Sequence, residues 1–474
     1  MKKTILHLIL LALVLSCGYK PQPIGPVPSA QQQAWHELEQ YAFIHFSINT
    51  FTNKEWGYGD ESPSLFNPSE LDADQWVRVL QEAGMKGVIL TCKHHDGFAL
   101  WPSQFTEHSV KNSPYKQGKG DVVREVAEAC RKYGLQFGVY LSPWDRNHPD
   151  YGTPAYLTYY RNQLTELFTQ YGPIFEMWFD GANGGDGYYG GKRAQVKING
   201  AQYYDWPTTL KHVRSMQPAV LFFSDAGPDI RWVGNERGIA GETNWNSISP
   251  DTLFAGKSNI ESLLQTGHPE GTRWIPAEVD VSIRPGWFYH AEEDARVKTP
   301  EQLFEIYLTS VGRGSNLLLN VPPDRRGKIH EEDVKSLQGW AKLRADRLSN
   351  NLAAKAKIMA SSSSRGWEAN LVLDSKKETH WMPKKSDKSP TLSIQFTQAV
   401  PVQYVQIQEG IAYGQRVRSF VIEGYLGSEW IQLYQGTTLG YKRIIPIKGD
   451  ALQQLRIRFL DSKGVPIIKE LAVF

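Results

Sequence analysis

A regular alternation of short apolar runs and longer amphipathic segments between residues 41 and 325 is the feature that most constrains the fold. The apolar runs have the length of buried strands, and most are separated by segments with helical periodicity. The expected strands are 41–48, 87–92, 136–141, 174–179, 219–223, 230–233, 273–281 and 315–321; expected helices include 72–83, 121–133, 155–170, 205–216 and 300–311. This order predicts a (β/α)8 barrel. A doubly wound open sheet is the alternative, but no phosphate-binding glycine motif follows any strand.

Several of the expected strands end on a polar or aromatic side chain. The run from Ile174 to Phe179 reaches Asp180 and then breaks into glycine and asparagine. An ionised carboxylate inside an apolar strand is costly, so one placed where the strand stops is expected to face a cleft. An Asp that only shapes the turn is the alternative, and recurrence of the pattern argues against it. The other candidates at or just after strand ends are His45, Glu55, Trp56, His94, His95, Tyr140, Trp178, Trp232 and Glu236.

The histidines raise the question of a metal site. His45, His94, His95 and Asp96 could supply ligands, but they lack the helical i, i+4 pair and the compact spacing of common zinc sites. We therefore expect no metal and no cofactor. A G-x-S-x-G motif for nucleophilic serine chemistry is also absent from the sequence. Two carboxylates in a neutral pocket rich in His and Trp instead suit glycoside hydrolysis, in which one attacks the anomeric carbon and one protonates the leaving oxygen.

Composition supports a sugar as the partner. The chain has 52 basic and 50 acidic residues and a net charge of +2, with no basic block, which excludes nucleic acid as an expected partner. It also has 15 Trp and 22 Tyr, whose rings stack on the apolar faces of sugars.

The N-terminus has the pattern of a bacterial secretory signal. Two lysines precede an apolar run from Ile5 to Leu15, and the run ends at Ser16-Cys17, which resembles a lipobox. We expect a lipoprotein signal peptide over residues 1–17 with Cys17 as the lipidated residue; an ordinary cleaved signal is the alternative. Residues 18–33 are expected to be a tether. The protein is thus expected to be exported to the periplasm or the outer membrane and to meet a membrane only through its lipid anchor.

The sequence pattern changes after residue 351. Residues 34–351 are expected to form the barrel and its closing helix, and residues 352–474 show short alternating runs separated by Gly, Pro, Ser and Asp. That pattern predicts an all-β sandwich. The remaining cysteines, Cys92 and Cys130, are expected to be buried thiols.

Five strings carry a family resemblance: AFIHFSINTFTNKEWG, CKHHDGFALWPS, GVYLSPWDRN, EMWFDGAN and RWVGNERG. In this order they resemble the α-L-fucosidases of glycoside hydrolase family 29, over residues 41 to about 350. The resemblance implies a retaining double displacement with Asp180 as the nucleophile and Glu236 as the acid/base, with Glu242 in AGETNW as the alternate. It also implies that fucose is enclosed by His45, Glu55, Trp56, His94, His95 and Tyr140.

A further string, WIPAEVDVSIRPGWFYH from Trp274, resembles the subgroup that prefers α-1,3- or α-1,4-linked fucose in branched, Lewis-type glycans. The resemblance implies that Glu278, Asp280 and Trp287 lie at the rim, where they could reach the aglycone. The loop GGDGYYGGKR from Gly184 departs from the pattern and could reshape the aglycone side.

The C-terminal region resembles discoidin-like or carbohydrate-binding modules, with GTTLGYKRI and RVRSFVIEGY as the closest strings. It is expected either to bind galactose or a related sugar, or to be a structural module. For the whole chain, the alternatives to an α-1,3/1,4-fucosidase are a catalytically inactive glycan-binding lipoprotein, a fucosidase with relaxed linkage preference and a different exo-glycosidase.

Overall fold

The computed structural model describes residues 21–251, 253–447 and 451–474. The described chain forms two compact units, residues 28–350 and residues 351–474, and the second includes the N-terminal segment 21–27. The predicted signal peptide and Cys17 lie outside the described residues. Within the described part of the chain, no helix is long and apolar enough to cross a membrane.

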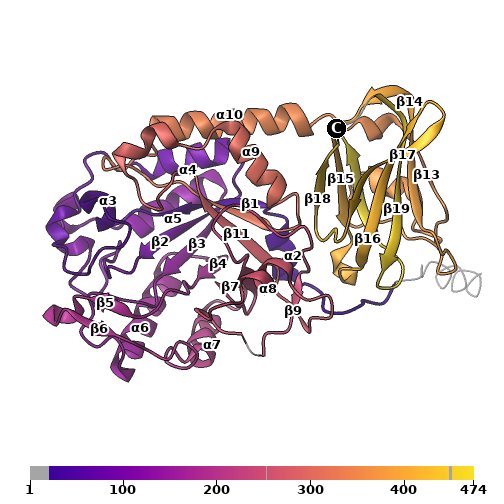
Figure 1. The fold of residues 1–474 in the computed structure, drawn as a ribbon. Coiled ribbons are helices and arrows are strands. Elements are labelled where there is room, and N and C mark those ends of the chain that lie inside the picture. Colours follow the sequence, from indigo (N-terminus) through magenta and orange to yellow (C-terminus); the bar gives the residue numbers. More distant parts are fainter. Residues whose placement is uncertain (1–20, 252, 448–450) are drawn as a thin grey trace, which may run out of the picture. The chain divides into compact units, whose positions relative to one another are not determined.

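The first unit is a closed barrel of eight parallel strands among the described residues (Figure 1). The strand order around the barrel is β1-β12-β11-β8-β7-β4-β3-β2. The strands are β1 (Gln40–Ile44), β2 (Gly87–Lys93), β3 (Gln136–Leu141), β4 (Glu176–Trp178), β7 (Leu221–Ser224), β8 (Ile230–Trp232), β11 (Ala277–Ser282) and β12 (Asn316–Asn320). The barrel closes where β1 pairs with β12, with Tyr41 opposite Leu318.

Helices surround this barrel, and capping residues mark where several of them begin. The helices are α2 (Ala30–His36), α3 (Ile48–Thr52), α4 (Ala73–Glu82), α5 (Val122–Tyr133), α6 (Pro154–Gln170), α7 (Trp206–Met216), α8 (Glu261–Thr266), α9 (Pro300–Thr309) and α10 (Glu331–Leu348). Asp121 accepts from Arg124 N at the start of α5, and Gly134 ends it in the left-handed conformation. The connection from β7 to β8 has no helix; residues 225–229 join the two strands directly.

The barrel interior is filled by side chains from alternate strand positions. Tyr41, Ile89, Phe223 and Leu318 are buried in one cluster, and Trp35 of α2 joins it. The Trp35 indole N–H donates to Tyr41 Oη at 2.8 Å and to Glu176 Oε2 at 3.0 Å. The helix before the first strand is therefore bonded to the barrel interior.

One predicted strand is divided in the structure. We expected a single strand over residues 273–281, but Arg273–Trp274 (β10) pairs antiparallel with Ser247–Ile248 (β9), and the barrel strand β11 begins at Ala277. The break falls at Pro276, which has no N–H to donate to a neighbouring strand. A further small hairpin, β5 (Gly185–Gly187) with β6 (Ala194–Val196), lies in the glycine-rich loop after Asp180.

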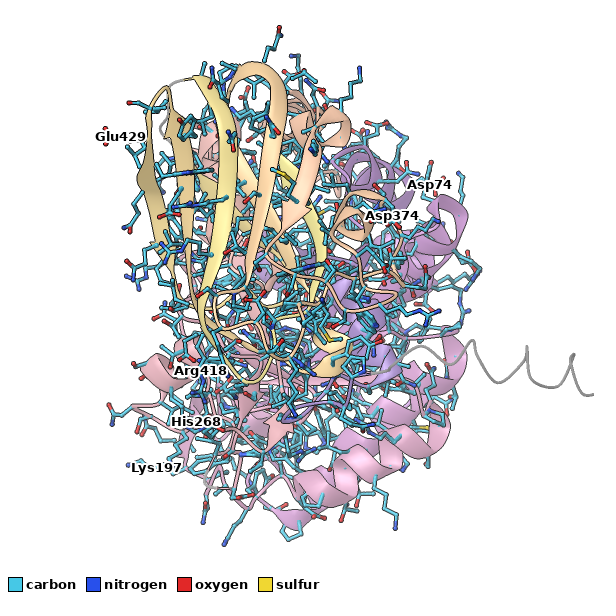
Figure 2. The ribbon with its side chains drawn as sticks, turned by 90° about the vertical axis from the view of Figure 1, so that its right-hand side faces the viewer. Asp74, Lys197, His268, Asp374, Arg418 and Glu429 are labelled. Atoms are coloured by element: carbon cyan, nitrogen blue, oxygen red, sulfur yellow. The ribbon has the colours of Figure 1, made fainter. Side chains whose placement is uncertain are left out.

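The second unit is a sandwich of antiparallel sheets. Within the described residues, β13-β14-β19-β16-β17 form one sheet and β18-β15-β20 the other. The strands are β13 (Lys357–Ala360), β14 (Thr391–Pro401), β15 (Tyr404–Glu409), β16 (Val417–Leu426), β17 (Glu429–Gly436), β18 (Arg443–Pro446), β19 (Ala451–Ser462) and β20 (Ile468–Val473). Apolar residues of both sheets pack in one core, while charged side chains such as Arg418 and Glu429 lie on the surface, at opposite ends of the β16–β17 hairpin (Figure 2). The predicted fold class, a barrel followed by an all-β sandwich, is confirmed.

The segment expected to be a tether, residues 18–33, is hydrogen-bonded to the sandwich unit in the part that the structure describes. Arg416 Nη2 donates to the Gln22 carbonyl at 2.7 Å, and Ile24 N donates to the Tyr413 carbonyl at 3.1 Å. Gly414, at φ +89, leaves no room for a Cβ beside the Ile24 carbonyl. From Ala30 the chain is already helical. The tether prediction is therefore wrong for the described part of this segment, because Gln22 and Ile24 are bonded to the sandwich unit and residues 30–33 belong to α2.

Candidate active site

The barrel carries one pocket that contains most of the predicted residues, with a volume of about 440 Å³. It lies at the carboxyl ends of the strands, where (β/α)8 barrels place their functional groups. The predicted residues that line it are His45, Glu55, Trp56, His94, His95, Trp178, Asp180, Trp232, Glu236, Asp280 and Trp287. Tyr140, Glu242 and Glu278 were also predicted for the site, but they do not line the pocket.

Asp180 is held by donors from both sides. Tyr140 Oη donates to Asp180 Oδ2 at 2.9 Å, and the backbone N–H of Ala182 donates to Oδ1 at 2.7 Å. His95 Nε2 lies 3.7 Å from Oδ2. Burial, followed by the charge of Asp180, raises the pKa of Tyr140 well above its usual value, so the phenol stays a donor. Tyr140 therefore positions the Asp180 carboxylate. We expected Tyr140 to line the pocket, but it does not.

The three histidines of the pocket are neutral. Burial lowers the pKa of His45 to about 3 and the pKa of His94 well below its usual value. Burial also lowers the pKa of His95, against the opposing charge of Asp180. His45 Nδ1 is bonded to Asn320 Oδ1 at 2.9 Å, and His95 Nδ1 to Ser142 Oγ at 2.7 Å. Neutral rings of this kind can exchange hydrogen bonds with sugar hydroxyls without adding charge.

Glu236 lies on the loop after β8 and faces the same pocket. The Trp287 indole N–H donates to its Oε2 at 3.3 Å. The residue is exposed overall, but its carboxyl group is partly buried, and this burial raises the pKa of Glu236. The hydrogen bond from Trp287 opposes the rise, and the charges of Asp180 and Glu55 add to it. Glu242, the alternate, is 60% exposed and forms an ion pair with Arg313. Of the two glutamates, only Glu236 lines the pocket.

The prediction that Glu278 and Asp280 lie at the rim is wrong, because both are on β11 inside the barrel. Glu278 is fully buried: its Oε1 accepts from the Trp178 indole at 2.8 Å and its Oε2 from Tyr41 Oη. Asp280 is 3% exposed and accepts from the Trp232 indole N–H at 2.8 Å. Asp280 borders the pocket from below, whereas Glu278 lies beneath Trp178, outside the pocket.

Glu55 fixes one wall of the pocket. Its carboxylate accepts from the backbone N–H groups of Trp287 at 2.8 Å and Phe288 at 3.1 Å, and it is bonded to His290 Nε2 at 2.7 Å. Three bonds to one loop indicate that Glu55 holds the Trp287 ring in place. Trp56 beside it is 53% exposed, with its ring edge against His95, which leaves an aromatic surface open to a ligand.

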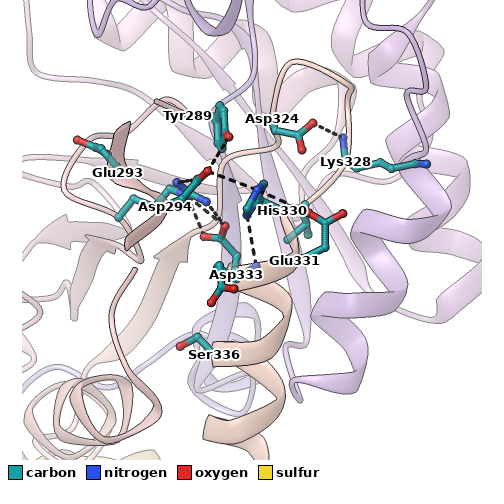
Figure 3. Close-up of polar contacts among 12 residues, drawn as sticks. Tyr289, Glu293, Asp294, Asp324, Lys328, His330, Glu331, Asp333 and Ser336 are labelled. Atoms are coloured by element: carbon teal, nitrogen blue, oxygen red, sulfur yellow. Dashed lines mark hydrogen bonds and ion pairs between the residues drawn. The ribbon is translucent and has the colours of Figure 1, made fainter. Parts of the chain in front are cut away.

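The Trp287 loop is fastened from behind as well. Arg284, 1% exposed, donates to Asp333 at the start of α10 and, at 2.8 Å, to Asp294 (Figure 3). Tyr289 Oη donates to Asp294 at 3.3 Å. These contacts anchor the loop between β11 and α9 to the closing helix, which keeps Trp287 over His45, 5.1 Å between ring centroids.

Sequence reasoning missed Phe43, Gly181, Ala182 and Asp225, which also line the pocket. Asp225 directly follows β7. It obeys the same pattern as Asp180, a carboxylate where an apolar strand stops, and could have been found by that pattern had the strand been extended past Phe223. Among the described residues, no group of three or more His, Cys, Asp and Glu side chains could hold a metal ion.

Comparison with known proteins identifies the family. A family model described as α-L-fucosidase matches residues 26–343. The chain belongs to the α-L-fucosidase family. The α-L-fucosidase 1 of Arabidopsis thaliana is 43% identical over 433 residues, which cover 90% of this chain and 82% of that protein. The predicted enzyme class, a glycoside hydrolase that releases fucose from fucosylated glycans, is confirmed.

Solved structures of family 29 fucosidases have the same fold as this chain. A glycoside hydrolase family 29 member from an unknown rumen bacterium superimposes with a TM-score of 0.87 at 46% identity, covering 96% of this chain and 78% of that chain. A family 29 fucosidase of Ruminococcus gnavus, solved with fucose, has a TM-score of 0.87 at 31% identity and covers 96% of both chains. A model described as F5/8 type C domain matches residues 357–469 of the sandwich.

Proposed function

We propose that this α-L-fucosidase works by a retaining double displacement, with Asp180 as the nucleophile and Glu236 as the acid/base. The observation that carries the proposal is the contrast between the two carboxylates that face the pocket. Asp180 accepts hydrogen bonds from Tyr140 Oη and from the backbone N–H of Ala182, which hold it in the pocket, whereas burial and nearby negative charge raise the pKa of Glu236. This is the division between a nucleophile and a proton donor that the mechanism requires.

In the first step Asp180 attacks the anomeric carbon of the fucosyl group, and Glu236 gives its proton to the departing oxygen. A β-linked fucosyl ester on Asp180 results. In the second step Glu236, now a carboxylate, takes a proton from water as the water attacks the anomeric carbon from the opposite face and releases the Asp180 carboxylate. His45, His94 and His95 bind the fucose hydroxyls, and Trp56 and Trp287 pack against its apolar faces.

The stereochemistry of the first product tests this mechanism. Proton NMR during hydrolysis should show α-L-fucose appearing first and converting slowly to the β anomer. If β-L-fucose appears first, the reaction inverts configuration and the roles assigned to both carboxylates are wrong.

We further propose that the enzyme prefers α-1,3- and α-1,4-linked fucose on branched glycans. The resemblance of residues 274–290 to that subgroup supports it, and Trp287 of this segment stands at the pocket wall beside Glu236. Branched substrates should be cleaved with a kcat well above that for α-1,2-linked fucose or an aryl fucoside, since contacts to the branch orient the reacting sugar. Equal kcat/KM on an aryl fucoside would refute the preference.

Export as a lipoprotein is proposed from residues 1–17 alone. The expected outcome is membrane-associated enzyme that becomes soluble when Cys17 is changed to Ala. Fractionation of cells that express each form measures this, and an unchanged distribution would contradict it.

A further inference from the structure

Asp225 is a carboxylate of the pocket that the double displacement does not use. It lies at the tip of β7, and its Oδ2 accepts from the backbone N–H of Gly256 at 2.7 Å. Among the described residues, no other residue donates a hydrogen bond to its Oδ1. Burial raises the pKa of Asp225 to about 6, against the Gly256 N–H, with a further contribution from Asp180. One oxygen of this carboxylate is thus bonded to the Gly256 loop, and the other accepts no hydrogen bond from another residue of the pocket.

The chain is built to leave room for this carboxylate. A Cβ on Gly181, the residue after the nucleophile, would lie 2.0 Å from Asp225 Oδ2 and 2.6 Å from Oδ1. A Cβ on Gly256 would lie 2.3 Å from Asn183 Nδ2 and 2.8 Å from the Gly181 carbonyl. The two loops therefore pack closely around Asp225 through glycines, and the carboxylate is held at a defined place beside Ala182.

The order of the strands shows on which side of the reacting sugar Asp225 lies. Around the barrel, β7 stands between β4, which carries Asp180, and β8, which leads to Glu236. The histidines that bind fucose follow β1 and β2, on the other side of β4. If Glu236 is the acid, the departing oxygen must lie within its hydrogen-bond reach. The leaving sugar then occupies the side of the pocket where Asp225 is exposed.

We propose that Asp225 recognises the leaving group by accepting a hydrogen bond from a hydroxyl of the sugar to which fucose is attached. This rests on the proposed assignment of Glu236 as the acid. Asp225 is then a specificity-determining residue: it favours a hydroxylated sugar as the leaving group over an apolar or very small one. An ionised acceptor in a partly buried site makes a strong bond to a hydroxyl, and an analogue that lacks the hydroxyl leaves the carboxylate unpaired.

The test uses Asp225→Asn as a matched variant. The amide oxygen can still accept from Gly256 N, but the NH2 group that replaces the free oxygen cannot accept from a hydroxyl. Each enzyme is assayed on fucosyl-α-1,3- and fucosyl-α-1,4-N-acetylglucosamine and on α-L-fucosyl fluoride, whose leaving group has no hydroxyl. The kcat/KM of the variant on one of the disaccharides should fall by roughly 10- to 100-fold more than on the fluoride, in proportion to one lost charged hydrogen bond.

Deoxy disaccharides, each lacking one hydroxyl of the leaving sugar, sharpen the result. For the wild type, the kcat/KM on one of these deoxy compounds should be roughly tenfold or more below that on the parent disaccharide. For Asp225→Asn, the kcat/KM on that deoxy compound and on its parent should be equal. Glu305→Gln, which changes an exposed carboxylate on α9 outside the pocket, serves as the control and should show the wild-type pattern.

Two outcomes would overturn the proposal. Equal losses on the disaccharides and the fluoride would mean that Asp225 acts on Asp180 or on the fold, and no loss on any substrate would mean that it does not contact the leaving sugar. The proposed mechanism is tested separately, by the product anomer of the wild type and by azide with Glu236→Ala. Failure of the mechanism is therefore distinguishable from failure of the Asp225 assignment.

Discussion

Glu176 begins β4 and Asp180 lies two residues past the end of that strand, and the two carboxyl groups have different surroundings. Glu176 is fully buried in the barrel, where its Oε2 accepts from Trp35 and Tyr41 and where Glu278 is its neighbour. Asp180 stands just past the strand end, 24% exposed and surrounded by donors. Burial, followed by repulsion from Glu278, raises the pKa of Glu176 well above its usual value. The carboxyl group of Glu176 is thus part of the packed interior, and that of Asp180 faces the pocket.

The comparison teaches that position along a barrel strand decides what an acid can do. Burial removes both side chains from bulk solvent and disfavours two negative charges, so Glu176 and Glu278 retain at least one proton and act as hydrogen-bond partners for Trp35, Tyr41 and Trp178. At the strand end the backbone opens into a loop, and its N–H groups become available as donors. Four predictions test this contrast, from the largest expected effect to the smallest.

Replacement of the exposed acid by its amide should abolish turnover. Asp180→Asn should lose on the order of 10⁴-fold or more in kcat, equivalent to over about 5 kcal/mol of barrier, because the amide cannot form the ester. Circular dichroism and fucose binding should be unchanged. The matched change on the same strand, Glu176→Gln, should keep most of the activity. If Asp180→Asn retains a tenth of wild-type activity, Asp180 is not the nucleophile.

Removal of the second pocket carboxylate should impair both proton transfers. Glu236→Ala should lose roughly 10²- to 10⁴-fold in kcat on oligosaccharides, with a smaller loss on an activated fucoside that needs no acid. Azide should restore part of the activity on the activated fucoside, because it attacks the Asp180 ester without a base.

The product of that rescue identifies the face of attack, and NMR should show α-fucosyl azide. Glu242→Ala should show no rescue, since Glu242 is paired with Arg313 outside the pocket. Rescue of Glu242→Ala with retained configuration would move the acid/base role to that residue.

Truncation of the buried acid should affect stability more than chemistry. Glu176→Ala leaves a cavity and removes the second acceptor of the Trp35 indole, so unfolding free energy should fall on the order of 3 kcal/mol. Glu176→Gln keeps the volume and an acceptor oxygen, and its loss should be about 1 kcal/mol or less. Urea unfolding followed by tryptophan fluorescence measures both. Equal stability of the two variants would show that the buried contacts are not what Glu176 contributes.

The smallest effect concerns pH. Burial raises the pKa of Glu176 and Glu278 above 4.5, so the folded chain keeps protons that the unfolded chain releases above that pH. Their contribution to stability is complete below the unfolded pKa and is lost as the pH rises through the folded pKa. Glu278→Gln cannot release such a proton. From about pH 5 to pH 7 its unfolding free energy should decline less steeply than that of the wild type, by roughly 1 kcal/mol over the whole range.

Glu242→Gln is the control for this measurement, because Glu242 is exposed, and it should follow the wild-type curve. Parallel curves for Glu278→Gln and the wild type would mean that Glu278 does not hold a proton in the folded barrel.

The sequence by itself determined the order of strands and helices, because hydrophobic periodicity and capping residues such as Asp121 act over a few residues. It also placed Asp180 and Glu236 at strand ends, since an apolar run that stops at an acid is a local signal. Only the tertiary structure decided what each acid faces. Glu278 and Asp280 were expected at the rim, but they lie two residues apart on β11 and therefore share one face of the strand, which is the face that points into the barrel. Asp225 follows the same local pattern, and a longer predicted strand would have marked it, but only the closed barrel shows that it shares a pocket with Asp180 and Glu236. Which side chains share a pocket depends on how eight strands close around one another, and that pairing is set by long-range packing that no short stretch of sequence records.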